Sequence, residues 1–335
     1  MDRRDFMAIG GVAAALIGAN AARSEAASVA PRGFGRSVTD FGVELNTDAD
    51  QTAAMQKALN EISASGNPAF LPAGRYMVSA LELPSPLGLF GIPGFSIISP
   101  RERNLALKMR GEGSLTMSGI LFDGLATGLS ASIRPPILDL QGVDVHLSGL
   151  SFKDTAGDAI RLTGCHRVRL SEISIANCYG DGIAAARCGP VSVTNCDISQ
   201  CALDGIGVSS PSGAELAHIV SNRIAEAKRH GMRIEGNAVI TANAIESGGQ
   251  IGIRIGSQDR LGNASVVNNM VRGAAVGIAA SSAGDGYALI SMNMITGARN
   301  GGVRALNGDE LIGKDLTKGG SEAFRNLAIA ANVSL

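Results

Sequence analysis

A short pattern, glycine or alanine followed by a large apolar residue, recurs through the second half of the sequence at a nearly constant interval of roughly 23 residues. Its apolar members are Ile160, Ile183, Ile206, Met232, Ile253, Ile278 and Val303. A second apolar position recurs in phase with the first, at Ile175, Ile198, Ile224, Ile245, Val271 and Ile295. Because a period of this length indicates structural units that stack on one another, the pattern predicts a solenoid.

Within the repeats, apolar and polar side chains alternate, as at residues 232–234 and 253–255, where an arginine lies between two apolar residues. This period of two indicates β-strands, and the Leu-x-x-Leu-x-Leu frame of leucine-rich repeats is missing. An asparagine also recurs just before the second apolar position. Asparagine tolerates left-handed backbone and can hydrogen-bond to its equivalent in the next coil, so a ladder is expected. Its members are Asn222, Asn243, Asn269 and Asn293.

The segment that precedes the repeats predicts a capping helix, which would cover strand edges at the end of a solenoid. Asp48 or Asp50 can cap the helix, and Gly66 follows its end. One face would carry Ala54, Met55, Ala58, Leu59 and Ile62. The segments 38–42 (VTDFG) and 70–76 (FLPAGRY), together with the coils, resemble the pectin-lyase-like superfamily. The resemblance implies an all-β fold, a single-stranded right-handed parallel β-helix with a short N-terminal capping helix.

The first residues have the pattern of an export signal. Arg3 and Arg4, followed by Phe6, resemble the twin-arginine motif, and a short apolar run, residues 8–19, comes next. We expect a signal peptide over residues 1–26, recognition by the twin-arginine translocase, and a periplasmic or secreted protein; an N-terminal helix is the alternative. With its coils, the chain most resembles exported β-helix repeat proteins of unassigned activity. No later apolar run is long enough to span a bilayer as a helix, so we do not expect an integral membrane protein.

The expected organisation is therefore a signal peptide, a linker and one β-helix domain. The expected ranges are 1–26 for the signal, 27–36 for the linker, 37–335 for the domain, and within it 37–100 for the cap and first coils, 101–150 for irregular early coils, 151–315 for the regular coils and 316–335 for an incomplete last coil. The open C-terminal end of such a solenoid is a candidate site for oligomerisation.

Charge and composition exclude some function classes. The formal net charge is −1, which gives no basic surface for nucleic acid. Tryptophan is absent and there are three tyrosines, so aromatic platforms for sugars are scarce.

Polar side chains at one register of the repeat are the candidate site. Asp158, Asp181, Asp204 and His230 each lie two residues before an inward apolar residue, so they would stack in successive coils. Such carboxylates raise one another's pKa, and they can share protons, act in catalysis or bind Ca²⁺. No other cofactor is expected.

Arginines recur at the outward position just after the first apolar residue, at Arg161, Arg233, Arg254 and Arg304. Guanidinium groups bind uronate carboxylates without help from aromatic rings. The superfamily resemblance therefore implies a lyase or glycoside hydrolase that acts on an acidic polysaccharide. The chain departs from the hydrolase pattern, because it has no Asn-Thr-Asp, and Arg229 precedes the pair His230-Gly231.

A structural interpretation stays open for each of these residues. Asp-Gly is a favoured turn dipeptide, and arginine is common on exposed strands. The chain would then be a non-catalytic envelope scaffold or binding module on the same β-helix, and whether it is an enzyme is undecided from the sequence.

Cysteines also recur in phase. Cys165 and Cys188 follow equivalent strands, as do Cys178 and Cys201, while Cys196 has no partner. Each pair would stack in adjacent coils, either as reduced thiols that pack in the core or as a disulfide. The sequence contains no Cys-x-x-Cys motif, so it gives no indication of a zinc site.

Overall fold

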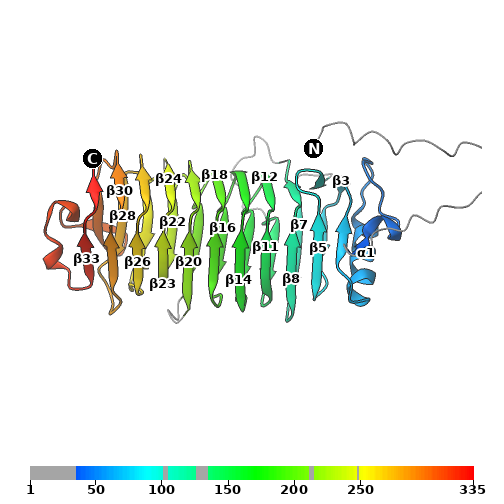
Figure 1. Ribbon diagram of the computed structural model, residues 1–335, viewed down its shortest axis with the longest axis horizontal. Helices are drawn as coiled ribbons and strands as arrows, with labels where there is room; N and C mark the ends of the chain where they lie inside the picture. The colour runs from blue at the N-terminus through cyan, green and yellow to red at the C-terminus, as the bar shows by residue number, and fades with distance from the viewer. Residues whose placement is uncertain (1–34, 101–104, 126–134, 211–214, 247–248) are drawn as a thin grey trace, which may run out of the picture. The chain divides into compact units, whose positions relative to one another are not determined.

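The computed structural model describes residues 35–100, 105–125, 135–210, 215–246 and 249–335. These residues form a solenoid of short strands that lie side by side in successive coils (Figure 1). The predicted signal peptide, with Arg3, Arg4 and Phe6, lies outside the described residues.

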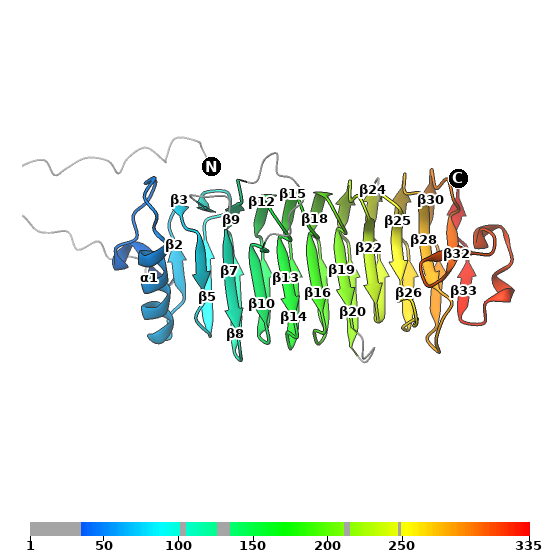
Figure 2. The ribbon, with the colours of Figure 1, turned by 180° about the vertical axis from the view of Figure 1, so that it is seen from behind.

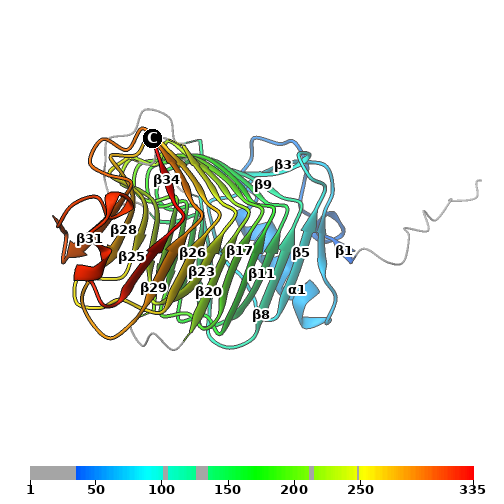
Figure 3. The same cartoon turned by 60° about the vertical axis from the view of Figure 1, so that its left-hand side comes forward.

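Each coil contributes one strand to each of three sheets, which we call A, B and C. Along the chain a strand of sheet C is followed by one of sheet A and then one of sheet B. Neighbouring strands are parallel, except that β32 is antiparallel to β31. Figure 3, which looks obliquely along the stack, shows how each coil bends at its corners.

The strands of sheet A are β1 Arg36–Ser37, β2 Ala69–Leu71, β5 Leu87–Gly91, β8 Ser114–Ser118, β11 Asp144–Ser148, β14 Arg167–Ser171, β17 Val191–Thr194, β20 Leu216–Val220, β23 Asn237–Thr241, β26 Ala264–Val267, β29 Ala288–Ser291 and β33 Leu327–Ala330. Those of sheet B are β3 Gly74–Met77, β6 Ser96–Ser99, β9 Leu121–Asp123, β12 Ser151–Thr155, β15 Ser174–Cys178, β18 Asp197–Cys201, β21 Arg223–Ala225, β24 Ala244–Glu246, β27 Met270–Arg272, β30 Met294–Thr296 and β34 Val333–Ser334. Those of sheet C are β4 Ala80–Glu82, β7 Ala106–Arg110, β10 Leu138–Gln141, β13 Ile160–Thr163, β16 Ile183–Ala186, β19 Ile206–Ser209, β22 His230–Glu235, β25 Ile251–Ile255, β28 Val276–Ser281, β31 Val303–Asn307 and β32 Glu310–Ile312.

The core consists of inward side chains that stack in register from coil to coil. Ile183 pairs with Ile206, and Ile206 with Met232, as the first apolar position of the repeat predicts. The second apolar position stacks in the same way in sheet B, where Ile198 pairs with Ile224. These side chains are almost fully buried. The predicted parallel β-solenoid is therefore confirmed, residue by residue, at both positions.

A helix, α1 Thr52–Ala64, lies at the N-terminal end of the stack (Figure 2). It buries Met55, Ala58, Leu59 and Ile62, four of the five residues predicted for its apolar face. The backbone N–H of Thr52 donates to Oδ1 of Asp50 at 2.8 Å. The predicted capping helix is therefore confirmed.

The asparagine ladder forms at the corner between sheets A and B. Each of the four predicted members donates its backbone N–H and its Nδ2 to Oδ1 of the asparagine in the next coil, at 2.8 to 3.0 Å, and Asn332 is the last acceptor. The expectation that these asparagines adopt left-handed backbone is wrong. Positive φ falls on the preceding residue, for example Ala242 at 57°, because the chain turns there and leaves the asparagine free to project along the stack.

After β31 the chain departs from the repeat. β31 and β32 form a hairpin, and two 3-10 turns follow, η2 Leu316–Lys318 and η3 Ser321–Ala323. Leu316 is buried, and Phe324 and Ile329 pack against the core. Strands β33 and β34 then pair with β29 and β30.

Candidate functional site

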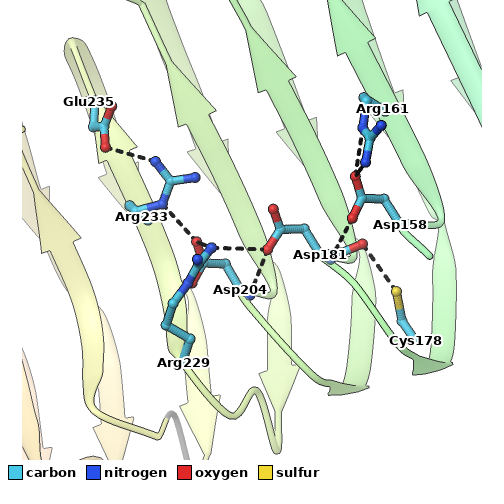
Figure 4. A network of polar contacts seen from close by, with 8 residues as sticks. All are labelled: Asp158, Arg161, Cys178, Asp181, Asp204, Arg229, Arg233 and Glu235. Carbon is cyan, nitrogen blue, oxygen red and sulfur yellow. Dashed lines mark hydrogen bonds and ion pairs between the residues drawn. The ribbon is translucent and has the colours of Figure 1, made fainter. Parts of the chain in front are cut away.

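The predicted acidic row lies at the corner between sheets B and C. Asp158, Asp181 and Asp204 each lie in the short turn that leads from a strand of sheet B into one of sheet C. Figure 4 shows their side chains side by side in consecutive coils, surrounded by arginines. All three residues are at most 8% exposed. The register of the repeat thus brings together three carboxylates that come from three successive repeats of the sequence.

The first two carboxylates bind the backbone of the next coil. Oδ1 of Asp158 accepts the N–H of Asp181 at 2.9 Å, and Oδ1 of Asp181 accepts the N–H of Asp204 at 2.8 Å. Gly180 permits this arrangement, because a Cβ there would overlap Oδ1 of Asp158. The carboxylates therefore form a ladder along the stack, and they provide hydrogen-bond acceptors for buried backbone N–H groups.

Arginines approach the three carboxylates unequally. Arg161 binds Oδ2 of Asp158 through Nε and Nη2, at 2.8 and 2.7 Å. Asp204 is bound by Nε and Nη2 of Arg229 and by Nε of Arg233, at 2.5 to 2.8 Å. Asp181 has only a longer contact, 3.3 Å from its Oδ1 to Nη2 of Arg229. Asp181 is thus the least neutralised of the three.

These surroundings shift the pKa values in opposite directions. Burial raises the pKa of the Asp181 carboxyl to about 6, and the charges of Asp204 and Asp158 add to this effect. Burial also acts on Asp204, but hydrogen bonds from Arg229 and Arg233 outweigh it and hold the pKa of Asp204 below its usual value. Near neutral pH, Asp181 can therefore gain or lose a proton while Asp204 stays ionised.

His230 continues the row in the next coil, but in a different environment. It is 4% exposed, and its Nδ1 has no hydrogen-bond partner. Burial lowers the pKa of His230 to about 4, and the charge of Arg254 acts in the same direction. The next residue in the same column is Ile251. His230 is thus neutral at physiological pH, at the point where the row changes from acidic to apolar.

The four predicted arginines lie in one outward column of sheet C, but they have different partners. Arg161 and Arg233 lie beside the acidic row. Arg254 is 9% exposed and is held by the β31–β32 turn, where it contacts Oδ1 of Asp309 at 2.6 Å. Arg304 donates to the carbonyl oxygens of Asn300 and Gly313. The structure therefore brings Arg161 and Arg233 to the row, and it engages Arg254 and Arg304 near the C-terminal end.

Between Arg161 and Arg233 the outward column contains only small residues, Ala184 and Gly207. A Cβ built on Gly207 would lie 3.2 Å from Nη2 of Arg233 and 3.9 Å from Oδ2 of Asp181. Nε and Nη1 of Arg233 are bound by Asp204 and Glu235. Nη2 of Arg233 and Oδ2 of Asp181 therefore both lie close to the outward side of Gly207, a place that we call the Gly207 notch.

Arg229 and Glu235 belong to this network and were not predicted as site residues. Arg229 occupies the position that Gly180 and Leu203 occupy in the two preceding coils. The sequence could have indicated Arg229, because it is the single basic residue in that column and only a long side chain there can reach back across two coils. Among the described residues, no cluster of three or more His, Cys, Asp or Glu side chains is arranged to hold a metal ion.

Comparison with known proteins agrees with this architecture. The family described as "Right handed beta helix region" matches residues 137–271. No curated protein sequence matches the chain. No helix within the described ranges is long and apolar enough to cross a membrane.

Solved structures that resemble the chain include two exopolygalacturonases and an adhesin. The family 28 exopolygalacturonase of Yersinia enterocolitica has a TM-score of 0.52 and 18% identity, over 89% of this chain and 70% of that one. For the exopolygalacturonase of Thermotoga maritima the values are 0.56 and 14%, over 84% and 77%. For the Streptococcus pneumoniae surface protein and adhesin PfbA they are 0.50 and 12%, over 89% and 97%. With the stacked coils and the family match, these likenesses show that the chain has the fold of a right-handed parallel β-helix.

Proposed function

We propose that the outer face of sheet C binds an acidic polysaccharide and that Asp181 transfers a proton in its cleavage. The observation that carries this proposal is the Gly207 notch, where Oδ2 of Asp181 and Nη2 of Arg233 both lie close to the outward side of Gly207. A uronate carboxylate can accept hydrogen bonds from Arg233 there, and its sugar ring would then lie against Asp181. Ala184 and Gly207 are small, so no long side chain from either position competes with that ring.

Among cleavage reactions, the site favours β-elimination over hydrolysis. Elimination needs one group that takes up a proton beside the uronate carboxylate and a cation that stabilises the charge on that carboxylate. Hydrolysis needs two carboxyl groups that both reach the glycosidic bond. Asp158 and Asp204 are held by Arg161, Arg229 and Arg233, whereas Asp181 has a pKa of about 6. The two exopolygalacturonases among the structural neighbours support a polysaccharide substrate at the level of the fold.

The test is an activity assay with a variant that fills the notch. Purified protein is incubated with polygalacturonate, alginate and glycosaminoglycans, with and without Ca²⁺, and both unsaturated uronate absorbance and new reducing ends are measured. Gly207→Leu should lower kcat/KM at least about tenfold, because the added side chain displaces Arg233 and occupies the place of the sugar. Ser192→Leu, an outward position on β17 in sheet A, is the matched control and should retain activity. If none of these polymers yields either product, the cleavage proposal is wrong.

A non-catalytic binding module is the second candidate, and one observation favours it. Asp158 and Asp204 are engaged in bonds that hold coils together, so most of the row has a structural purpose. The adhesin PfbA among the neighbours supports this candidate at the level of the fold. The binding module would be favoured over the enzyme if Asp181→Asn bound a polysaccharide as tightly as the unmodified chain and if neither formed any product.

We also infer export through the twin-arginine translocase and oligomerisation at the C-terminal end. The first rests on Arg3, Arg4 and Phe6. Replacing both arginines by lysine should retain the protein in the cytoplasm, as cell fractionation would measure. The second rests on the outer edges of β33 and β34, which pair with no further strand among the described residues. Analytical ultracentrifugation of the purified chain tests it.

A further inference from the structure

Two pairs of cysteines are stacked in adjacent coils. Cys165 and Cys188 occupy equivalent positions in the turns that follow β13 and β16, and Cys178 and Cys201 are register partners in β15 and β18. All four are free thiols. Adjacent strands are about 4.8 Å apart, which falls within the Cα separation that a disulfide bridges. Spacing alone therefore permits a disulfide in either pair.

The surroundings of the two pairs differ. Cys165 and Cys188 form part of the wall of a surface depression of about 560 Å³, together with His166, Arg187 and Pro190. All four cysteines are buried and belong to the core, and the thiol of Cys178 donates to the carbonyl oxygens of Gly157 and Asp181 at 3.1 Å. The pairs differ in that Cys165 and Cys188 line this depression, from which a small reagent can approach them, whereas Cys178 and Cys201 do not line it.

We propose that Cys165 and Cys188 are a redox pair that closes to a disulfide between adjacent coils when a small disulfide oxidant enters this depression. The second pair stays reduced in the folded protein. The inference is independent of any polysaccharide activity, because it depends only on the stacking of the turns and on access from the depression.

The reaction is a thiol–disulfide exchange in two steps. The Cys165 thiolate attacks one sulfur of the oxidant, which forms a mixed disulfide and releases one oxidant thiolate. Sγ of Cys188, after loss of its proton, then attacks Sγ of Cys165 and releases the second thiolate. In total, two protein thiols lose two electrons and two protons, and the disulfide of the oxidant gains them as two thiols.

The order of these steps follows from the contact between the two thiols. A hydrogen bond from Cys188 is the largest effect on Cys165 and lowers the pKa of its thiol to about 7, whereas the same contact raises the pKa of Cys188 well above its usual range. Because the thiolate is the nucleophile, Cys165 is the attacking residue. Once Cys165 is in the mixed disulfide, the thiol of Cys188 is the nearest resolving group.

The test is oxidation of the folded full-length protein with oxidised glutathione, followed by thiol counting and peptide mapping under non-reducing conditions. We expect two of the five thiols to be lost and a single cross-linked peptide pair that contains Cys165 and Cys188. The cross-link joins residues that lie one full coil apart in the chain, so it restricts the unfolded state. It should therefore raise Tm by about 5 °C, and dithiothreitol should reverse the shift.

Matched variants separate the two pairs. Cys188→Ala should abolish the cross-link and the Tm shift, whereas Cys201→Ala should retain both. The mapping of the unmodified chain decides the question even if a variant fails to fold. Five thiols that stay free until the protein is unfolded, a Cys178–Cys201 cross-link, or glutathione that remains attached to Cys165 would each overturn the proposal.

Discussion

Asp181 and His230 lie in one column of side chains, two coils apart, and burial changes their protonation in opposite ways. Burial raises the pKa of Asp181, and its neighbours supply too little positive charge to offset this, so its protonated form is favoured in the folded protein. The pKa of His230 is shifted downward because the ring is enclosed beside Arg254, so its neutral form is favoured. Each shift links folding stability to pH, with opposite sign.

The two linkages should nearly cancel between pH 4 and pH 6.5. The folded pKa of Asp181, about 6, exceeds its unfolded value, so the folded state binds more protons and this contribution to stability is lost as pH rises from about 4 to 6. The folded pKa of His230, about 4, lies below its unfolded value, so its contribution is lost as pH falls from about 6.5 to 4. Each contribution is on the order of 3 kcal/mol at most.

Single variants should therefore reveal how each residue makes the free energy of unfolding depend on pH, when unfolding in urea is measured across this pH range. In Asp181→Asn the free energy of unfolding should rise with pH, because the Asp181 linkage no longer offsets that of His230. In His230→Leu the free energy of unfolding should fall with pH. Leucine is chosen because Ile251, the next residue in the same column, is also apolar. Parallel profiles for the two variants and the unmodified chain would show that neither shift exists.

At this scale, the positions in the row were predictable but the roles were not. The glycine-apolar register determines where Asp158, Asp181 and Asp204 lie, because each coil places the same turn at the same corner. Their charge states depend on Arg229, whose side chain reaches Asp204 and Asp181 from a neighbouring coil. Such a reach depends on side-chain conformation, which a repeat pattern does not specify.

Among the elements, the corner between sheets A and B is held by the asparagine ladder. Nδ2 of Asn243 donates to the carbonyl oxygens of Ile219 and Thr241 and to Oδ1 of Asn269, and its Oδ1 accepts from Asn222. Because this amide is buried, its removal leaves several polar groups of two other coils without partners.

Asn243→Ala should therefore lower the free energy of unfolding by about 3 kcal/mol, the penalty for leaving such groups buried and unpaired. Ser265→Ala, at an outward position on β26, is the control and should change it by less than about 0.5 kcal/mol. Chemical denaturation measures both. Equal stability of Asn243→Ala and the unmodified chain would mean that water replaces the ladder.

The residue before each ladder asparagine holds the turn under backbone strain, since left-handed φ is unfavourable for residues with a side chain. Ala242 has φ of 57°. Ala242→Gly should therefore raise the free energy of unfolding by about 0.5–1 kcal/mol, in contrast to the usual effect of glycine in a strand. Ala176→Gly, at an outward position of β15, should lower it. The same sign for both variants would contradict the assigned turn geometry.

Two of the three sheets were marked in the sequence by an apolar position that recurs in phase. Sheet A has the same kind of column, with Val168, Val191 and Ala217 in register, but its residues vary in size and no fixed glycine precedes them. The hairpin of β31 and β32 was not predicted either, because it leaves the repeat and pairs antiparallel through contacts that occur only once.

For the whole molecule, stacking means that a destabilising substitution in one coil mainly lowers the stability of that coil and of the coils that contact it. Ile206 is fully buried and packs between Ile183 and Met232 in the neighbouring coils. Ile206→Ala removes side-chain volume that the neighbours cannot fill, and it should cost about 3–4 kcal/mol of unfolding free energy. Ile206→Val, which removes one methylene group, should cost about 1 kcal/mol.

The distribution of that loss along the chain tests the solenoid more sharply than its size does. Because stability in a stacked array is approximately a sum over coils and their interfaces, amide hydrogen exchange in Ile206→Ala should accelerate most in β16, β19 and β22. Protection in β2 and β5, which lie several coils away beside α1, should stay close to that of the unmodified chain. A uniform acceleration from α1 to β31 would instead mean that the coils unfold as one cooperative unit, and the nearest-neighbour description of this protein would then be wrong.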